Sequence, residues 1–149
     1  MVETAHPYTT VYTDGSSTGR WGAGGWAWVV IDGPNAGRHD SGGDTWTTNQ
    51  RMELQAAHEA VRAISGLLLV VSDSQYVVNC FNDKWWRRWR QVGFRGVKNA
   101  DIWEPFIDDV LARRGEVKFA WVRGHAGLPG NEAVDVHAKA AKVAIGEAD

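Results

Sequence analysis

Alternation of apolar and polar positions predicts three strands in the first third of the chain. Residues 8–13 alternate β-branched and aromatic side chains and lead directly into Asp14 and a glycine, where we expect the strand to end. The glycine-rich residues 16–25 are expected to form a flexible connection. Strand patterns follow at residues 26–31 and 38–45, and the short links between the strands favour an antiparallel meander.

After the third strand, the apolar spacing changes to a helical period. Residues 50–64 place apolar side chains three and four positions apart, which predicts a helix that Thr48 or Asn49 can cap. The continuous apolar run at residues 67–71 is typical of a strand buried on both faces, and residues 117–122 alternate as a fifth strand. Further helices are expected at residues 75–81, 84–89, 101–113 and 131–145.

The elements follow one another in the order β-β-β-α-β-α-α-α-β-α. Three antiparallel strands pass to parallel ones through helical crossovers, which predicts an α/β fold with a five-stranded mixed sheet flanked by helices. A chain of 149 residues is long enough for one domain with a substantial core, so we expect a single domain over residues 1–149.

The composition is that of an ordinary globular protein, with 44% hydrophobic and 23% charged residues. No apolar run approaches the roughly 20 residues that a membrane-spanning helix needs. Residues 1–7 lack the basic and then apolar pattern of a signal peptide, and Cys80 is the only cysteine. We therefore expect a cytoplasmic protein with no membrane association. A chain that forms one free-standing domain is also expected to be a monomer.

Charge is distributed unevenly, although the formal net charge is only −2. Residues 84–98, the basic block, hold six of the 16 basic residues and none of the 18 acidic ones. Trp85, Trp86 and Trp89 lie within it, among the nine tryptophans of the chain. The block indicates a polyanion-binding face, and the alternative is a solvated charged surface over buried tryptophans.

Four carboxylates occupy positions where the predicted topology allows them to meet. Asp14 and Asp73 each follow a strand, while Glu53 and Asp135 lie near the starts of two helices. Taken singly, an Asp-Gly turn and acids at helix N-termini explain them without any site. Together they would repel one another unless cations neutralised them, and Mg²⁺ or Mn²⁺ suits such oxygen ligands. Two such ions about 4 Å apart can support phosphodiester hydrolysis.

Five sequence blocks, in order along nearly the whole chain, resemble the signature blocks of type 1 ribonuclease H. They lie at residues 13–16, 47–54, 72–77, 121–127 and 131–135. The resemblance implies a ribonuclease H-like fold and an endonuclease that hydrolyses the RNA strand of RNA–DNA hybrids. It also implies 3′-hydroxyl and 5′-phosphate products and a need for Mg²⁺ or Mn²⁺, with two ions during catalysis.

The same resemblance assigns roles to individual residues. Asp14, Glu53, Asp73 and Asp135 match the metal-binding carboxylates, and His125 matches a histidine that assists proton transfer or product release. The basic block resembles the family's substrate-binding handle, here carrying Trp85, Arg88 and Trp89. The remaining candidate substrate contacts are Ser16, Asn49, Gln50 and Gln75 on the RNA strand, and Thr48 and Asn99 at a phosphate of the DNA strand.

Three positions depart from the family pattern. Trp46 stands where many relatives have an arginine at the phosphate pocket, and Arg20 with Trp21 replaces a common Asn-Pro pair. Two alternatives are another nuclease on the same fold and a hybrid-binding module without activity. The intact loop at residues 124–127 and the handle count against the first, and the four acids count against the second.

Overall fold

The computed structural model describes residues 7–124 and 128–148. The element order predicted from the sequence is confirmed. The strands are β1 (Thr9–Ser17), β2 (Gly22–Asp32), β3 (His39–Thr47), β4 (Leu68–Ser72) and β5 (Val117–Trp121). The helices are α1 (Asn49–Ala63), α2 (Gln75–Asn82), α3 (Trp85–Gln91), α4 (Ala100–Ala112) and α5 (Pro129–Ala148).

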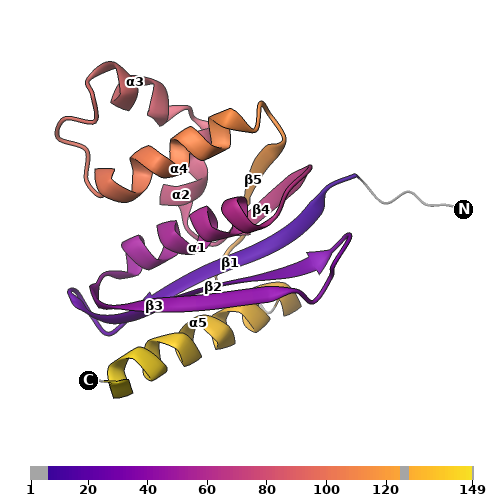
Figure 1. Cartoon of the computed structure of the whole chain (residues 1–149), viewed down its shortest axis with the longest axis vertical. Coiled ribbons are helices and arrows are strands. Elements are labelled where there is room, and N and C mark those ends of the chain that lie inside the picture. The colour runs from indigo at the N-terminus through magenta and orange to yellow at the C-terminus, as the bar shows by residue number, and fades with distance from the viewer. Residues whose placement is uncertain (1–6, 125–127, 149) are drawn as a thin grey trace, which may run out of the picture.

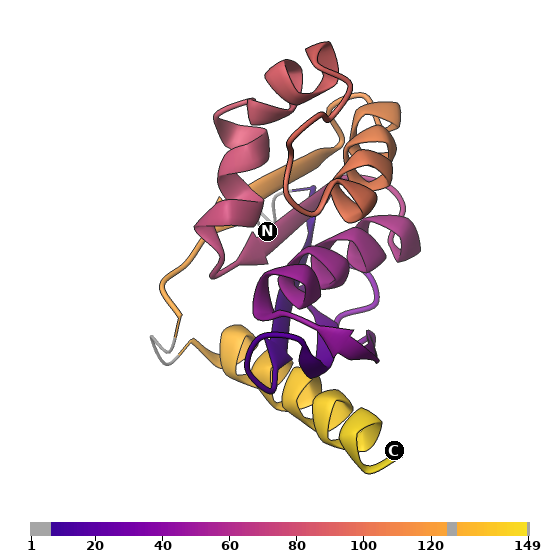
Figure 2. The same cartoon turned by 90° about the vertical axis from the view of Figure 1, so that its left-hand side faces the viewer.

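One mixed sheet with the strand order β3-β2-β1-β4-β5 forms the centre of the fold. β1 pairs antiparallel with β2 and parallel with β4, β2 pairs antiparallel with β3, and β4 pairs parallel with β5. Helices α1 to α4 lie on one side of this sheet and α5 lies on the other (Figures 1 and 2). The predicted α/β fold is therefore confirmed.

Side chains alternate across β2, so the two faces of the sheet have separate cores. Trp28 and Val30 point to the larger core beneath α1, α2 and α4, where Trp103 is fully buried. Ala27 and Val29 point to the opposite face, where the buried residues of α5 are small enough to let the helix approach closely. Among the described residues, no helix has the length and apolar character of a membrane span.

Two expectations for the N-terminal strands are wrong. β1 does not end at Asp14 but continues to Ser17, because Asp14 to Ser17 still pair with β2 after the partner strand β4 has ended. The glycine-rich stretch is not a flexible connection throughout, since β2 already begins at Gly22. A side chain at Gly25 would place its Cβ 2.4 Å from the carbonyl oxygen of Ala138, so the glycine lets α5 rest on the strand.

The helix boundaries differ from expectation by a few residues. The Thr48 side chain caps α1 by accepting a hydrogen bond from the Arg51 N–H at 3.2 Å, so Glu53 lies just beyond the first turn. α5 begins at Pro129, and Asn131 is buried inside the helix. Proline suits this first position because its fixed φ is already helical.

Candidate active site

Strand pairing and one glycine bring three acidic side chains together. Thr13 of β1 pairs with Ser72 of β4, so the next residues, Asp14 within β1 and Asp73 just after β4, lie at the same level of the sheet. A Cβ at Gly15 would lie 2.2 Å from the carbonyl carbon of Met52 and 2.4 Å from the Glu53 nitrogen. The backbone of α1 therefore crosses β1 in contact with this glycine, which places Glu53 beside Asp14.

The resulting cluster has the geometry of a cation site. One carboxylate oxygen from each of Asp14, Glu53 and Asp73 lies within 4.8 Å of the others. Only carboxylate oxygens contribute to the group, and hard oxygen ligands of this kind suit Mg²⁺, Mn²⁺ or Ca²⁺ better than softer metals. The residues present therefore fit a divalent cation.

Burial and mutual repulsion raise the proton affinity of the cluster. The pKa of Asp14 rises to about 8, first because the side chain is buried and then because Asp73 is close. The pKa of Glu53 rises to about 7 for the same two reasons, although a hydrogen bond with Ser74 opposes the shift. A bound cation would replace these protons and remove the repulsion.

Asp135 joins the cluster from the other face of the sheet. This residue of α5 is hydrogen-bonded to Asp14 and lies 3.1 Å from Lys139 Nζ. Asp14, Asp73 and Asp135 line one pocket of about 330 Å³ together with Asn131 and two further residues of α5. Asp135 is therefore at the site, although it is outside the tight group of three. His125 lies outside the described residues.

The raised pKa values predict that the metal-free protein loses stability as the pH rises. Below about pH 4, Asp14 and Glu53 are protonated in both the folded and the unfolded chain. Above it the unfolded chain releases their protons while the folded chain keeps them. Each such carboxyl group therefore lowers the free energy of unfolding by roughly 1.4 kcal/mol per pH unit, until the pH exceeds the pKa of that group in the folded protein. In EDTA, the melting temperature should fall between pH 5.5 and pH 8.

The variant Asp14→Asn provides the control for this pH effect. It has no carboxylate to deprotonate at position 14 and should show a flatter dependence and a higher melting temperature at pH 8. Thermal melts of both proteins in EDTA across this range make the comparison. Parallel curves would show that Asp14 carries no raised pKa.

The candidate substrate contacts Ser16, Thr48, Asn49 and Gln50 lie next to the acidic cluster. Ser16 accepts a hydrogen bond from Lys142 Nζ of α5 at 3.3 Å. The Asn49 side-chain oxygen accepts hydrogen bonds from Ser17, from its N–H at 2.7 Å and its hydroxyl at 3.1 Å. Asn49 and Glu53 are four residues apart, so they share one face of α1.

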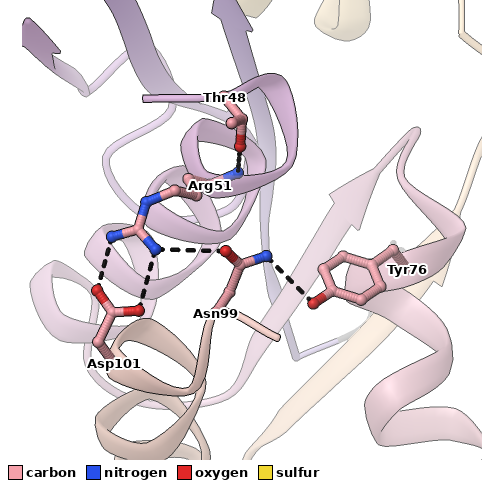
Figure 3. Close-up of polar contacts among 5 residues, drawn as sticks. All are labelled: Thr48, Arg51, Tyr76, Asn99 and Asp101. Carbon is pink, nitrogen blue, oxygen red and sulfur yellow. Dashed lines mark hydrogen bonds and ion pairs between the residues drawn. The ribbon is translucent and has the colours of Figure 1, made fainter. Parts of the chain in front are cut away.

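Asn99 belongs to a polar network between α1 and α4 (Figure 3). Its oxygen accepts a hydrogen bond from Arg51 Nη1 at 3.3 Å, and its amide donates to the Tyr76 hydroxyl at 3.4 Å. Arg51 also donates two hydrogen bonds, of 3.0 and 2.6 Å, to the carboxylate of Asp101, and these lower the pKa of that carboxyl group. The predicted sites did not include Arg51, Tyr76 or Asp101.

The basic block contributes α3 and a following irregular segment. None of the α3 residues is buried, but Trp85 and Trp89 pack partly against the larger core, and Trp89 meets Trp103 edge to face at 5.2 Å. Arg88 is exposed. The tryptophans are thus neither fully buried beneath a charged surface nor fully free for binding. Each indole is half-buried, and its exposed part is available to a ligand. Gln75, the first residue of α2, is also exposed.

Comparison with known proteins gives one consistent result. A family model described as RNase H matches residues 6–143. A protein named ribonuclease H from Nitratidesulfovibrio vulgaris is 43% identical over 138 residues, covering 88% of this chain and 86% of that protein. Ribonuclease H from Cupriavidus necator is 40% identical over 144 residues, which cover 92% and 97%. The Campylobacter concisus protein of the same name is 38% identical over 132 residues, covering 87% and 89%.

Proposed function

This chain belongs to the ribonuclease H family and hydrolyses the RNA of RNA–DNA hybrids, and we propose that Asp14, Glu53, Asp73 and Asp135 hold the divalent cations of this reaction. The main observation behind this proposal is that carboxylate oxygens of Asp14, Glu53 and Asp73 lie within 4.8 Å of one another. They lie together because Gly15 lets the backbone of α1 contact the strand. The ribonuclease H family uses divalent metal, and a pair of Mg²⁺ or Mn²⁺ ions is the finer proposal for this chain.

Each carboxylate has a separate task in this proposal. Bound cations supply activation of water and stabilisation of the negative charge that develops at the phosphate. Asp14 and Asp73, fixed by the paired strands, hold the centre in place, and Glu53 completes it from α1. Asp135 adds a fourth carboxylate beside Asp14 and borders the open pocket where a phosphate can enter. Burial of Asp14 excludes water from one side of the site.

The product ends and the proton-transfer residue belong to the same proposal. Attack of water on the phosphorus with departure of the 3′ oxygen leaves a 3′-hydroxyl and a 5′-phosphate. We assign to His125 the transfer of a proton at this site, a task to which histidine side chains are suited. That assignment comes from the family resemblance of residues 121–127 alone.

Selection of RNA requires contacts with the 2′-hydroxyl, since phosphate contacts do not distinguish RNA from DNA. Side-chain amides and hydroxyls can both donate to and accept from this group. Ser16, Asn49, Gln50 and Gln75 are the proposed contacts on the RNA strand. One pocket is lined by Thr48, Asn49 and Gln50. Asn99 accepts a hydrogen bond from Arg51, which lies in the same helix as Asn49 and Gln50. Thr48 and Asn99 are proposed for the DNA strand.

The handle is expected to contribute affinity through charge and aromatic contact. Replacing both Trp85 and Arg88 by Ala should weaken hybrid binding about tenfold, and the salt slope of log Kd should fall by about 0.9 through the lost phosphate contact. Binding at several salt concentrations measures both quantities. The control is Arg62→Ala, because Arg62 is exposed in the last turn of α1. Unchanged Kd and slope in the double variant would remove the handle from the substrate site.

A cleavage assay on three matched duplexes tests the proposed function. RNA–DNA hybrid, double-stranded RNA and double-stranded DNA are incubated with Mg²⁺ or Mn²⁺ and, in parallel, with EDTA. We expect cleavage only of the RNA in the hybrid, and none in EDTA. Cleavage of DNA alone would favour another nuclease on the same fold, and no cleavage with either metal would favour a binding module.

We also propose that the protein is a monomer and is located in the cytoplasm. Light scattering during gel filtration tests the monomer.

A further inference from the structure

His39 and His137 form a pair of stacked imidazole rings between the sheet and α5. The ring centroids lie 4.4 Å apart and the ring planes are 20° apart. His39 is exposed at the start of β3, and His137 is half-buried in α5. Two imidazoles that are this close and reach solvent are a candidate metal site, since histidine is the commonest metal ligand in proteins.

The packing of two regular elements sets the distance between these rings. His39 pairs with Val29 of β2, whose side chain belongs to the core between the sheet and α5. Further along β3, a Cβ at Gly43 would lie 2.5 Å from Cγ1 of Ile145 in α5. The steps from His39 to Gly43 and from His137 to Ile145 both span roughly 12–13 Å along their elements. β3 and α5 therefore run side by side, and this packing holds the imidazoles together.

A hydrogen bond from the ring of His39 leaves its other nitrogen available. His39 Nδ1 lies 3.3 Å from the carbonyl oxygen of Gly37. A carbonyl oxygen can only accept a hydrogen bond, so Nδ1 carries the proton and Nε2 of the neutral ring keeps its lone pair. Metal-binding histidines commonly have this arrangement, in which a backbone carbonyl orients the ring through the nitrogen that does not bind the metal. His39 is therefore oriented to ligate through Nε2.

The charged neighbours of His39 in the sequence lie on the opposite face of the sheet. The Arg38 guanidinium lies over the Trp28 ring, 5.4 Å from its centroid, and Trp28 belongs to the larger core. Asp40 pairs with Trp28 in the strand ladder and so shares that face. A cation at the imidazoles is therefore neither repelled by Arg38 nor bound by the carboxylate of Asp40. The nitrogen ligands decide which metal the pair prefers.

The chemistry and spacing of the two rings identify the class of metal. Imidazole nitrogen suits Zn²⁺, Ni²⁺ and Cu²⁺, whereas Mg²⁺ prefers oxygen ligands. With metal–nitrogen bonds of about 2.0–2.1 Å, tetrahedral coordination by two imidazoles places their centroids roughly 5 Å apart. The observed separation is 4.4 Å in a stack, so each ring must turn about its side-chain bonds to direct a nitrogen at the same ion. Access to solvent permits this rotation and leaves coordination positions for water.

We propose that His39 and His137 bind one Zn²⁺, Ni²⁺ or Cu²⁺ ion, which links β3 to α5. Because the two ligands meet only in the folded chain, binding of the ion stabilises the fold. The site goes beyond the proposed function and does not depend on it, because neither histidine belongs to the acidic cluster. Asp135 is two residues before His137, and the two side chains leave α5 about 200° apart around the helix axis.

Calorimetric titration with Ni²⁺ in excess Mg²⁺ tests this site. We expect one Ni²⁺ per chain at the histidine pair, and His39→Ala and His137→Ala should each weaken Kd at least about tenfold, because a single imidazole cannot chelate the ion. The double variant should bind no more weakly than either single variant, and it reports any Ni²⁺ bound by the carboxylates. His6→Ala also removes one imidazole and is the matched control, with the parental Kd expected.

Thermal melts give a second measurement on the same proteins. Ni²⁺ at a hundredfold excess over Kd should raise the melting temperature of the parent protein by roughly 5 °C or more, and should leave those of the two alanine variants unchanged. Without Ni²⁺, melting temperatures within about 2 °C of the parent would show that the variants are folded. An equal rise in the parent and in both variants would contradict a site at His39 and His137.

Two further outcomes decide whether the rings share one ion. If each single variant halves the number of bound Ni²⁺ ions without changing Kd, the imidazoles bind separate ions and the shared site is wrong. The electron paramagnetic resonance spectrum of one equivalent of Cu²⁺ bound to the parent protein requires no variant. Coupling of the copper to two imidazole nitrogens is expected, and coupling to only one would overturn the proposal.

Discussion

Replacing Asp73 by Asn is expected to slow hybrid cleavage by roughly a thousandfold or more, which corresponds to about 4 kcal/mol of lost transition-state stabilisation. The amide keeps the size of the side chain but removes one negative charge from the group formed with Asp14 and Glu53. A neutral ligand weakens the hold on a divalent cation, and the reaction depends on that cation. Single-turnover cleavage of the hybrid in Mg²⁺ measures the loss.

The fold should survive this replacement. Asp73 is one of the charges that raise the pKa of Asp14 and of Glu53, so its removal relieves repulsion in the metal-free protein. The melting temperature in EDTA should therefore be unchanged or higher. Glu104→Gln is the matched control, because it removes one exposed charge from α4 and should cleave at the parental rate. Near-parental cleavage by Asp73→Asn would show that the metal is placed wrongly.

Replacing Gly15 by Ala is expected to lower both stability and activity. The new Cβ would lie 2.2 to 2.6 Å from backbone atoms of Met52 and Glu53, and no side-chain rotation can relieve a clash with backbone. The overpacking should cost about 3 kcal/mol, or roughly 10 °C in melting temperature for a chain of this size. α1 must move away from β1, which takes Glu53 out of the cluster and lowers the cleavage rate.

The control for this substitution is Gly146→Ala in α5. A Cβ at Gly146 would find its nearest neighbour, Ala23 Cβ, at 3.8 Å, which is ordinary contact. Alanine favours a helix over glycine, so the melting temperature should stay equal or rise slightly. Thermal melts and hybrid cleavage of both variants make the test. A Gly15→Ala protein with parental stability and activity would show that α1 does not depend on this close approach.

The fold was largely predictable because local sequence patterns determine most of its strands and helices. The spacing of apolar residues predicted the strands and helices in their order along the chain, and the structure confirms that order. The glycine-rich start of β2 was misread because glycine has low strand propensity. Its reason for being a strand is contact with α5, more than one hundred residues later, and no local pattern reveals such a contact.

The candidate site was predictable only in part. Strand ends in a parallel pair lie at one edge, so the proximity of Asp14 and Asp73 could be expected from topology. The Arg51–Asp101 pair and the hydrogen bond from Lys142 to Ser16 join residues 50 and 126 positions apart. Spacing along the chain carries no information about such partners. The roles of the individual site residues remain predictions.

Proton release on metal binding tests the metal site most directly. Calorimetric titration of the metal-free protein with Mn²⁺ at pH 7, in two buffers of different ionisation enthalpy, gives the number of protons released. With pKa values of about 8 for Asp14 and about 7 for Glu53, we predict a release on the order of one proton, which vanishes by pH 9.5. Asp14→Asn should bind more weakly and release fewer protons. Binding of Mn²⁺ without proton release, or with equal affinity and release in Asp14→Asn, would contradict a metal centre at Asp14, Glu53 and Asp73.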